Sequence, residues 1–255
     1  MAARRKDSSA RSSKKSATTR RDFLQVAGVV AAASVISDGY GSNWIRQFDN
    51  NANWVRTFGG TGSEPGQFKT PHGLWLDDRP DRVPTLVVAD RATARLQYLS
   101  LDGQHIGFVT QDSEGRPGLT SDVAALKSPV SFPAHFDIRG DMVLVPNLHA
   151  RVTLFDRNNK VITHLGNDPE WTKQVLGDGK FPVRGDRSLW QPGKFIHPHD
   201  ACFDRVGNVF VVEWKRCFFE DYLRQRRGTE TGRRGTETGR RPINKFRKAR
   251  ISVFR

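Results

Sequence analysis

Three histidines have the residue type and spacing that could do chemistry. His72, His135 and His199 each stand at the start of a short apolar run, with a proline one or two residues before. If these runs are the first strands of successive sheet modules around one axis, the three imidazoles converge there. Three imidazoles with an open fourth position form a catalytic zinc arrangement. The alternative is that histidine simply packs or hydrogen-bonds at strand starts, as we expect for the four histidines elsewhere: His105, His149, His164 and His197.

The segments around these histidines are typical of β-strands. Apolar and polar residues alternate with period 2 in short runs, and Gly, Asp, Asn and Pro separate the runs. A recurring order of histidine, strand, Asp-x-x-Gly and strand is typical of a β-propeller blade of the NHL type. The sequence therefore predicts an all-β, incomplete NHL-type propeller of about 3.5 blades. The expected blades cover residues 34–59, 66–110, 132–166 and 196–214.

Two longer connections interrupt this pattern. We expect residues 111–130 to form a loop between blades and residues 167–194 to form a long insertion. Loops of this length are usually functional or flexible.

The N-terminal segment, residues 1–34, is basic and polar and is predicted to be disordered up to an export signal. Arg20 and Arg21 precede a Phe-Leu pair and an apolar run, which is the pattern of a twin-arginine signal. Small residues at Ala31 and Ala33 offer a cleavage site, although a cut there would start the mature chain inside a strand. The run is too short for a stable membrane span. We therefore expect a periplasmic or otherwise exported protein.

The C-terminal segment, residues 215–255, differs in kind from the propeller body at residues 35–214. Residues 226–232 read RRGTETG, and residues 233–239 repeat these letters. Such a repeat has no apolar face and cannot offset its ordering entropy, so we expect a disordered arginine-rich tail. It could come from a frame change in the gene, or it could be an arm for an acidic partner.

The net charge of +14 suggests nucleic-acid binding, but the charge lies at the ends of the chain. Residues 1–25 hold 8 basic and 2 acidic side chains, and residues 215–255 hold 14 and 4, which leaves the middle at about −2. A nucleic-acid-binding propeller would carry its basic residues on the folded body. We therefore expect no nucleic acid to bind the body.

Several short motifs together resemble one enzyme family. They are Ser37-Asp38-Gly39-Tyr40, Pro65-Gly66-Gln67-Phe68, Pro71-His72, Ala89-Asp90-Arg91 and Pro198-His199-Asp200. In this order they are similar to the peptidyl-α-hydroxyglycine α-amidating lyases and their bacterial NHL-repeat relatives. The likeness covers residues 35–110 and 195–214 best.

That resemblance implies a six-bladed propeller with a histidine-bound zinc. It implies zinc ligation by His72 and His199, a base role for Tyr40 and a supporting role for Arg91. It also implies a structural calcium contact for Asp200. The family's first zinc histidine and a further arginine lie in blades that precede anything present in this sequence. His135 is expected to take the place of the missing ligand.

Two functions follow from this reading. The first is a zinc-dependent lyase, truncated and with doubtful activity, that cleaves peptidyl-α-hydroxyglycine to a peptide amide and glyoxylate. The second is a non-catalytic NHL propeller that binds a peptide or protein at its channel mouth, since the fold alone does not determine function. The sequence does not determine the oligomeric state.

Overall fold

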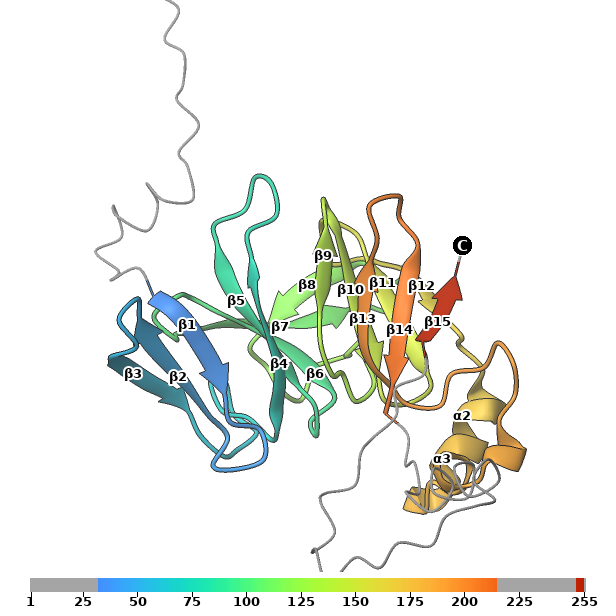
Figure 1. Ribbon diagram of the computed structural model, residues 1–255. Helices are drawn as coiled ribbons and strands as arrows, with labels where there is room; N and C mark the ends of the chain where they lie inside the picture. The colour runs from blue at the N-terminus through green and yellow to red at the C-terminus, as the bar shows by residue number, and fades with distance from the viewer. Residues whose placement is uncertain (1–31, 215–250, 255) are drawn as a thin grey trace, which may run out of the picture.

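The computed structural model describes residues 32–214 and 251–254 as an all-β architecture of four antiparallel sheets (Figure 1). The first sheet contains β1 (Ala32–Ser37), β2 (Trp44–Asp49) and β3 (Trp54–Gly59). The second contains β4 (Pro71–Asp77), β5 (Thr85–Asp90), β6 (Arg95–Leu99), β7 (His105–Gln111) and β8 (Pro117–Thr120). The third contains β9 (Asp137–Arg139), β10 (Met142–Asn147), β11 (Arg151–Phe155) and β12 (Val161–Leu165). The fourth contains β13 (Pro198–Phe203), β14 (Val209–Glu213) and β15 (Ile251–Phe254).

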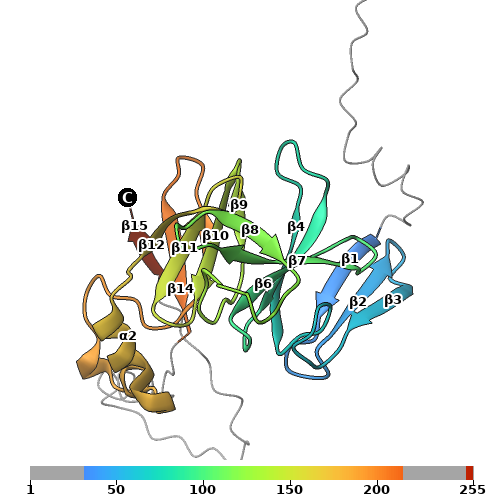
Figure 2. The ribbon, with the colours of Figure 1, turned by 180° about the vertical axis from the view of Figure 1, so that it is seen from behind.

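The sheets follow one another in chain order, with β1–β3 at one end of the molecule and β13–β15 at the other (Figures 1 and 2). An apolar core lies between each consecutive pair of sheets. Strand β5 shows how one sheet contributes to two of these cores. Leu86 and Val88 face the core shared with the first sheet, whereas Val87 and Ala89 face the core shared with the third. Alternate side chains point to opposite faces of a strand, so an apolar strand buried on both faces joins two cores.

The segment expected to be a loop between the second and third modules contains a strand. β8 pairs antiparallel with β7 and adds a fifth strand to the second sheet. The chain reverses at Asp112, whose carboxylate accepts hydrogen bonds from the backbone N–H groups of Glu114 and Arg116. This side-chain turn brings residues 117–120 back along β7.

The insertion at 167–194 is helical over part of its length. α2 (Pro169–Leu176) begins after Asp168, whose carboxylate accepts from the Trp171 N–H, and it ends at Gly177 in the left-handed conformation. α3 (Pro182–Gly185) follows. Trp171 and Val175 anchor α2 in a separate small core. An acidic N-cap, proline in the first turn and glycine at the C-cap are regular helix signals.

Two expectations fall wholly or partly outside the described residues. The twin-arginine signal lies in residues 1–31, and the arginine-rich repeat lies in residues 215–250. The rest of the C-terminal segment differs from the expected disordered tail, because β15 pairs with β14 from Val212↔Ile251 to Val209↔Phe254. In the part of the chain that is described, no helix has the length and hydropathy needed to cross a bilayer.

Candidate metal and catalytic site

A repeated backbone pairing at the start of each sheet positions the histidines. In the second, third and fourth sheets a proline bridges the last residue of the neighbouring strand, as Pro71↔Asp90, Pro133↔Asn147 and Pro198↔Glu213. In the second and fourth sheets the register then shifts by one residue, so that His72 and His199 each occupy a β-bulge. Bulges re-aim a side chain and are frequent beside active sites.

The same kind of hydrogen bond, which we call a brace, fixes the backbone just before each of these prolines. The residue that each proline faces is a buried polar side chain: Asp90, Asn147 or Glu213. Its oxygen accepts a hydrogen bond from the backbone N–H two residues before the proline, from Lys69 N at 2.7 Å, from Ser131 N at 2.9 Å and from Ile196 N. The braces fix the start of each strand and therefore the direction of the residue that follows the proline.

The braces also correct the expected register of the third histidine. The residue after Pro133 is Ala134, so Ala134 occupies the position that His72 and His199 hold in their sheets. His135 lies one residue further on and before β9 begins. Phe132 and Thr70, the residues before their prolines, both have a positive φ, of 60° and 65°, so the backbone approaches the second and third sheets in the same conformation.

His72 is held in a neutral form suited to binding a metal. Its Nδ1 lies 2.8 Å from the carbonyl oxygen of Ala134. A carbonyl can only accept, so Nδ1 carries the hydrogen and Nε2 keeps its lone pair. Burial lowers the pKa of His72 to about 4 and outweighs the Ala134 hydrogen bond, which raises it, and the nearby charge of Arg91 lowers it further.

His199 meets His72 from another sheet. The two rings pack edge to face, with centroids 4.8 Å apart and planes at 80°. The Trp214 ring lies beyond His199, at 6.2 Å between centroids. Two imidazoles far apart in the chain are therefore brought together, as the resemblance implies for zinc ligation.

His135 does not complete a three-histidine set. Its Nδ1 lies 2.9 Å from the carbonyl oxygen of Phe136 and 3.3 Å from Oδ1 of Asp200. Over residues 32–214 and 251–254, no group of three His, Cys, Asp or Glu side chains is placed to hold one metal ion. Two of the three imidazoles expected to converge, those of His72 and His199, therefore lie in contact, and His135 does not join them in a three-ligand group.

Tyr40 and Arg91 form the second half of the candidate site. Arg91 donates from Nη1 to the Tyr40 hydroxyl at 2.7 Å. Its guanidinium carbon lies 4.9 Å from the centre of the Tyr40 ring and 5.2 Å from that of Phe132. The Tyr40 ring in turn packs against His72, at 5.9 Å between centroids. Arg91 is buried, whereas Tyr40 is 75% exposed and faces solvent at the rim.

Asp200 lies beside this cluster. Its side chain is 54% exposed and its Oδ1 accepts from the Ala201 N–H at 2.8 Å, as well as lying near His135. Within the described residues, Asp200 belongs to no group of three His, Cys, Asp or Glu side chains placed to hold a metal ion. The calcium contact stays a prediction from the resemblance.

Sequence reasoning missed two parts of this site. Phe132 lies against Arg91, and the Ala134 carbonyl orients His72. One signal for the register was present in the sequence: proline directly precedes His72 and His199 but stands two residues before His135.

Comparison with known proteins adds little to this geometry. No protein-family model matches the chain, and no curated protein sequence matches it significantly. Among solved structures, a protein of unknown function from Bacteroides caccae is 10% identical, with a TM-score of 0.40, over 71% of this chain and 52% of its own. Glutaminyl cyclase from Myxococcus xanthus is 16% identical, with a TM-score of 0.36, over 72% of this chain and 68% of its own. The chain therefore spans about half the length of the first of these structures.

Proposed function

We propose that this chain is a segment of an NHL-type β-propeller with a zinc-dependent lyase site, which cleaves peptidyl-α-hydroxyglycine to a peptide amide and glyoxylate. One observation carries the proposal. The four residues singled out for catalysis and zinc ligation form one continuous chain of contacts. Tyr40 lies in the turn between β1 and β2, His72 in β4, Arg91 in the turn after β5 and His199 in β13.

The arrangement of sheets supports the propeller. Four antiparallel sheets follow each other in sequence, with a core between neighbours, and the first strands of the second and fourth carry their histidines at equivalent bulges. The first strand of each blade lines the central channel of a propeller, which would place both histidines there. A closed channel requires more blades, from a further segment or from another chain, because closure is what removes open sheet edges.

The two imidazoles fit a zinc ion. Nitrogen is a preferred donor for zinc, and the Nδ1 hydrogen bond to Ala134 leaves Nε2 of His72 as the ligating atom. A third protein ligand would come from outside the described residues. When bound, zinc lowers the pKa of a coordinated hydroxyl group.

The chain's own residues would carry the proton. The Tyr40 side chain, acting as a phenolate held by Arg91, would accept the proton of the substrate's α-hydroxyl. The O–H electron pair would then form the carbonyl of glyoxylate while the carbon–nitrogen bond breaks, and the Tyr40 phenol would return the proton to the departing nitrogen, which gives the amide and restores the phenolate. Buried Arg91 lies where it can stabilise negative charge on the Tyr40 oxygen.

The test is zinc content and glyoxylate release by the full chain. We expect about one zinc per chain and glyoxylate formation from an α-hydroxyglycine-extended peptide that stops with a chelator. His72→Ala and His199→Ala should lower zinc affinity by more than the about 10–100-fold that loss of an outer partner costs. His164→Gln is the matched control, because His164 bonds Thr153 and lies outside the contact chain. Zinc bound equally by all variants would refute the assignment.

A second candidate function is binding without catalysis. It is favoured because the described residues contain no group of three side chains placed to hold a metal ion, and because the ring of Tyr40 is exposed. In that case the same surface binds peptide or protein. Peptide binding that survives chelation and His72→Ala but is lost in Tyr40→Ala would support this function against the lyase.

We also propose export through the twin-arginine pair at Arg20 and Arg21. Replacing both with lysine should retain the chain in the cytoplasm, as followed by cell fractionation. Unchanged export would contradict the signal.

A further inference from the structure

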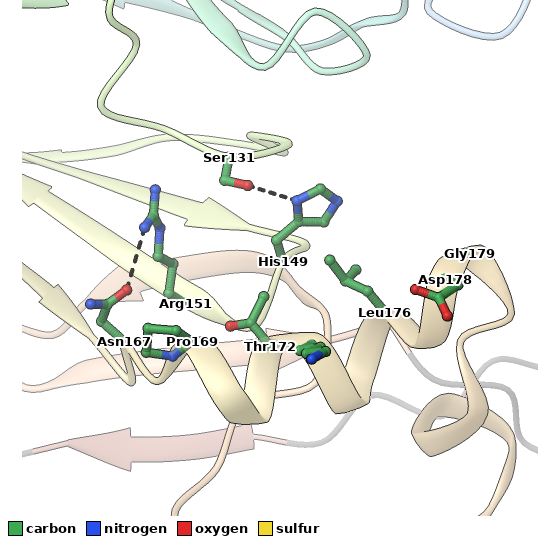
Figure 3. A pocket seen from close by; sticks show the side chains of 10 residues that line it. Ser131, His149, Arg151, Asn167, Pro169, Thr172, Leu176, Asp178 and Gly179 are labelled. Carbon is green, nitrogen blue, oxygen red and sulfur yellow. Dashed lines mark hydrogen bonds between the residues drawn. The ribbon is translucent and has the colours of Figure 1, made fainter.

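A hollow of about 560 Å³ lies between the third sheet and helix α2, outside the candidate lyase site (Figure 3). Its volume is within the roughly 300–1,000 Å³ range of small-molecule sites. One wall comes from the turn between β10 and β11 and from the start of β11, and the other comes from α2 and the turn after it. Its polar and charged lining residues are Ser131, His149, Arg151, Asn167, Thr172, Lys173 and Asp178.

Arg151 is the unusual group in this hollow. Its Nη1 donates to Oδ1 of Asn167 and its Nη2 to the carbonyl oxygen of Pro129, both at 3.3 Å. Its Nε is buried and has no hydrogen-bond partner. It forms no ion pair with any carboxylate of the described residues. Burial lowers the pKa of this guanidinium, which marks a cation taken out of water.

A partly buried cation without a counter-ion is costly. Buried charges in proteins are normally paired and hydrogen-bonded, and a guanidinium has five N–H groups to satisfy. In Arg151, two N–H groups donate long hydrogen bonds to neutral oxygens, and the Nε–H group is buried without any partner. An anion entering the hollow would supply the missing acceptor.

The surrounding groups suit the same ligand. Ser131 and Thr172 bring hydroxyl groups, and the Lys173 ammonium adds a second positive charge to the lining. Ser131 Oγ and His149 Nδ1 are 2.6 Å apart, which orients the imidazole (Figure 3). The one lining carboxylate, Asp178, lies with Gly179 at the far end from Arg151 and Asn167 (Figure 3). The lining therefore has two cationic side chains, Arg151 and Lys173, and its carboxylate lies away from Arg151.

We infer that this hollow binds a small organic oxyanion, a carboxylate or a phosphate monoester, whose charged oxygens lie against Arg151. Carboxylates and phosphates both match the planar fork of an arginine side chain. Leu176 lines the middle of the hollow and would contact the apolar part of the ligand (Figure 3).

The experiment is calorimetric titration of the full chain with inorganic phosphate and, separately, with sodium benzoate. We expect saturable binding of at least one probe, and which of the two binds identifies the class of oxyanion. Arg151→Gln should weaken that binding by about tenfold or more, because a charge-assisted hydrogen bond is lost. Leu176→Trp, which fills the hollow without touching a charge, should weaken it as well.

Arg116→Gln is the matched control, since it removes an arginine whose side chain is 70% exposed and lies outside the hollow. It should leave binding unchanged. Leu176→Trp keeps the test valid if Arg151→Gln fails to fold. The inference is overturned if neither probe saturates, or if both hollow variants bind as the wild type does.

Discussion

Arg91 donates a 2.7 Å hydrogen bond to the hydroxyl of Tyr40, which lies 51 residues earlier and on another sheet module. The two side chains differ in their surroundings, because Arg91 is buried and Tyr40 is 75% exposed. A rigid cation therefore holds a phenol at the surface, next to the ring of His72. This is a suitable position for a group that exchanges a proton with a ligand.

Replacing Arg91 with lysine tests this pair. Lysine keeps the charge but loses the planar fork that both bonds Tyr40 and stacks on the two rings. We expect kcat for glyoxylate release to fall by about 100-fold, the lower end of what a positioned acid or base contributes, with a small change in KM. Steady-state kinetics on the hydroxyglycine peptide measures both. A rise in KM with unchanged kcat would instead show that Arg91 binds the substrate and the transition state equally and does not assist the chemical step.

A second prediction concerns the close contact at Gly73. A Cβ built there would lie 2.5 Å from the Ala134 carbonyl oxygen and 2.8 Å from the Cα of His135. Gly73→Ala should therefore separate β4 from the Ala134 segment and lower the free energy of unfolding by about 1–3 kcal/mol. Zinc affinity should fall too, because His72 bonds the same carbonyl.

Gly118→Ala is the control for this change. Gly118 lies in β8, where the nearest atom to an added Cβ is Thr110 Cγ2 at an ordinary 3.6 Å. Its effect on urea unfolding should stay within about 0.5 kcal/mol. Equal effects of the two substitutions would show that the contact at Gly73 does not limit packing.

A third prediction follows from the buried phenol of Tyr98. Its hydroxyl donates to Oδ2 of Asp77 at 2.6 Å and accepts from Arg79 at 3.1 Å. Burial, followed by the charge of Asp77, raises the pKa of Tyr98 from 10.0 to about 12. Because the folded pKa is the higher one, its stabilising contribution is complete below pH 10 and is lost as the pH rises toward 12.

Urea unfolding at pH 8 and pH 11 measures this contribution. Tyr98→Phe should lower the free energy of unfolding at pH 8 by about 1–3 kcal/mol, since a buried hydrogen bond is lost. The variant should also lose less stability between the two pH values than the wild type does. An identical pH dependence in both proteins would refute the raised pKa.

A fourth prediction compares two roles of Asp90, its ion pair with Arg95 and its hydrogen bond to the backbone N–H of Lys69. This carboxylate accepts from Lys69 N and also from Nε of the buried Arg95, at 2.9 Å. Asp90→Ala removes both bonds and leaves the buried Arg95 without its carboxylate partner, so we expect a loss of about 3–5 kcal/mol. Asp90→Asn keeps an oxygen for Lys69 N, as Asn147 does for Ser131 in the third sheet, and should cost less. Equal losses in denaturant unfolding would contradict a bracing role.

Much of the strand pattern could be predicted from the sequence, because alternation and turn residues are local signals. Strands β5 and β6, for example, both lie inside the second expected blade at residues 66–110. The meeting of His72 and His199 was expected from their equivalent places at strand starts. The roles of Tyr40 and Arg91 beside them were expected only through family likeness, since local patterns do not determine which sheets meet. The short helix α2 was missed because its Asp-Pro start and glycine end are confined to a segment interpreted as an insertion.

The register of His135 could not be obtained by aligning histidines. It depends on which backbone groups Pro133 and Asn147 bring together and on the positive φ of Phe132, and both are set by tertiary contacts. The pairing of β15 with β14 was missed for a similar reason. A short run such as 251–254 gains its partner only from the fold.

The three braces also bear on how such modules can diverge. An aspartate, an asparagine and a glutamate perform one mechanical task, since each offers an oxygen to the same backbone donor. If selection acts on the backbone conformation at the start of the strand, it would preserve an oxygen acceptor at this position. The side chain that carries the oxygen could then be either charged or neutral. Successive modules could therefore differ in formal charge at the start of these strands, and so suit different ligands, while the backbone contacts stay the same.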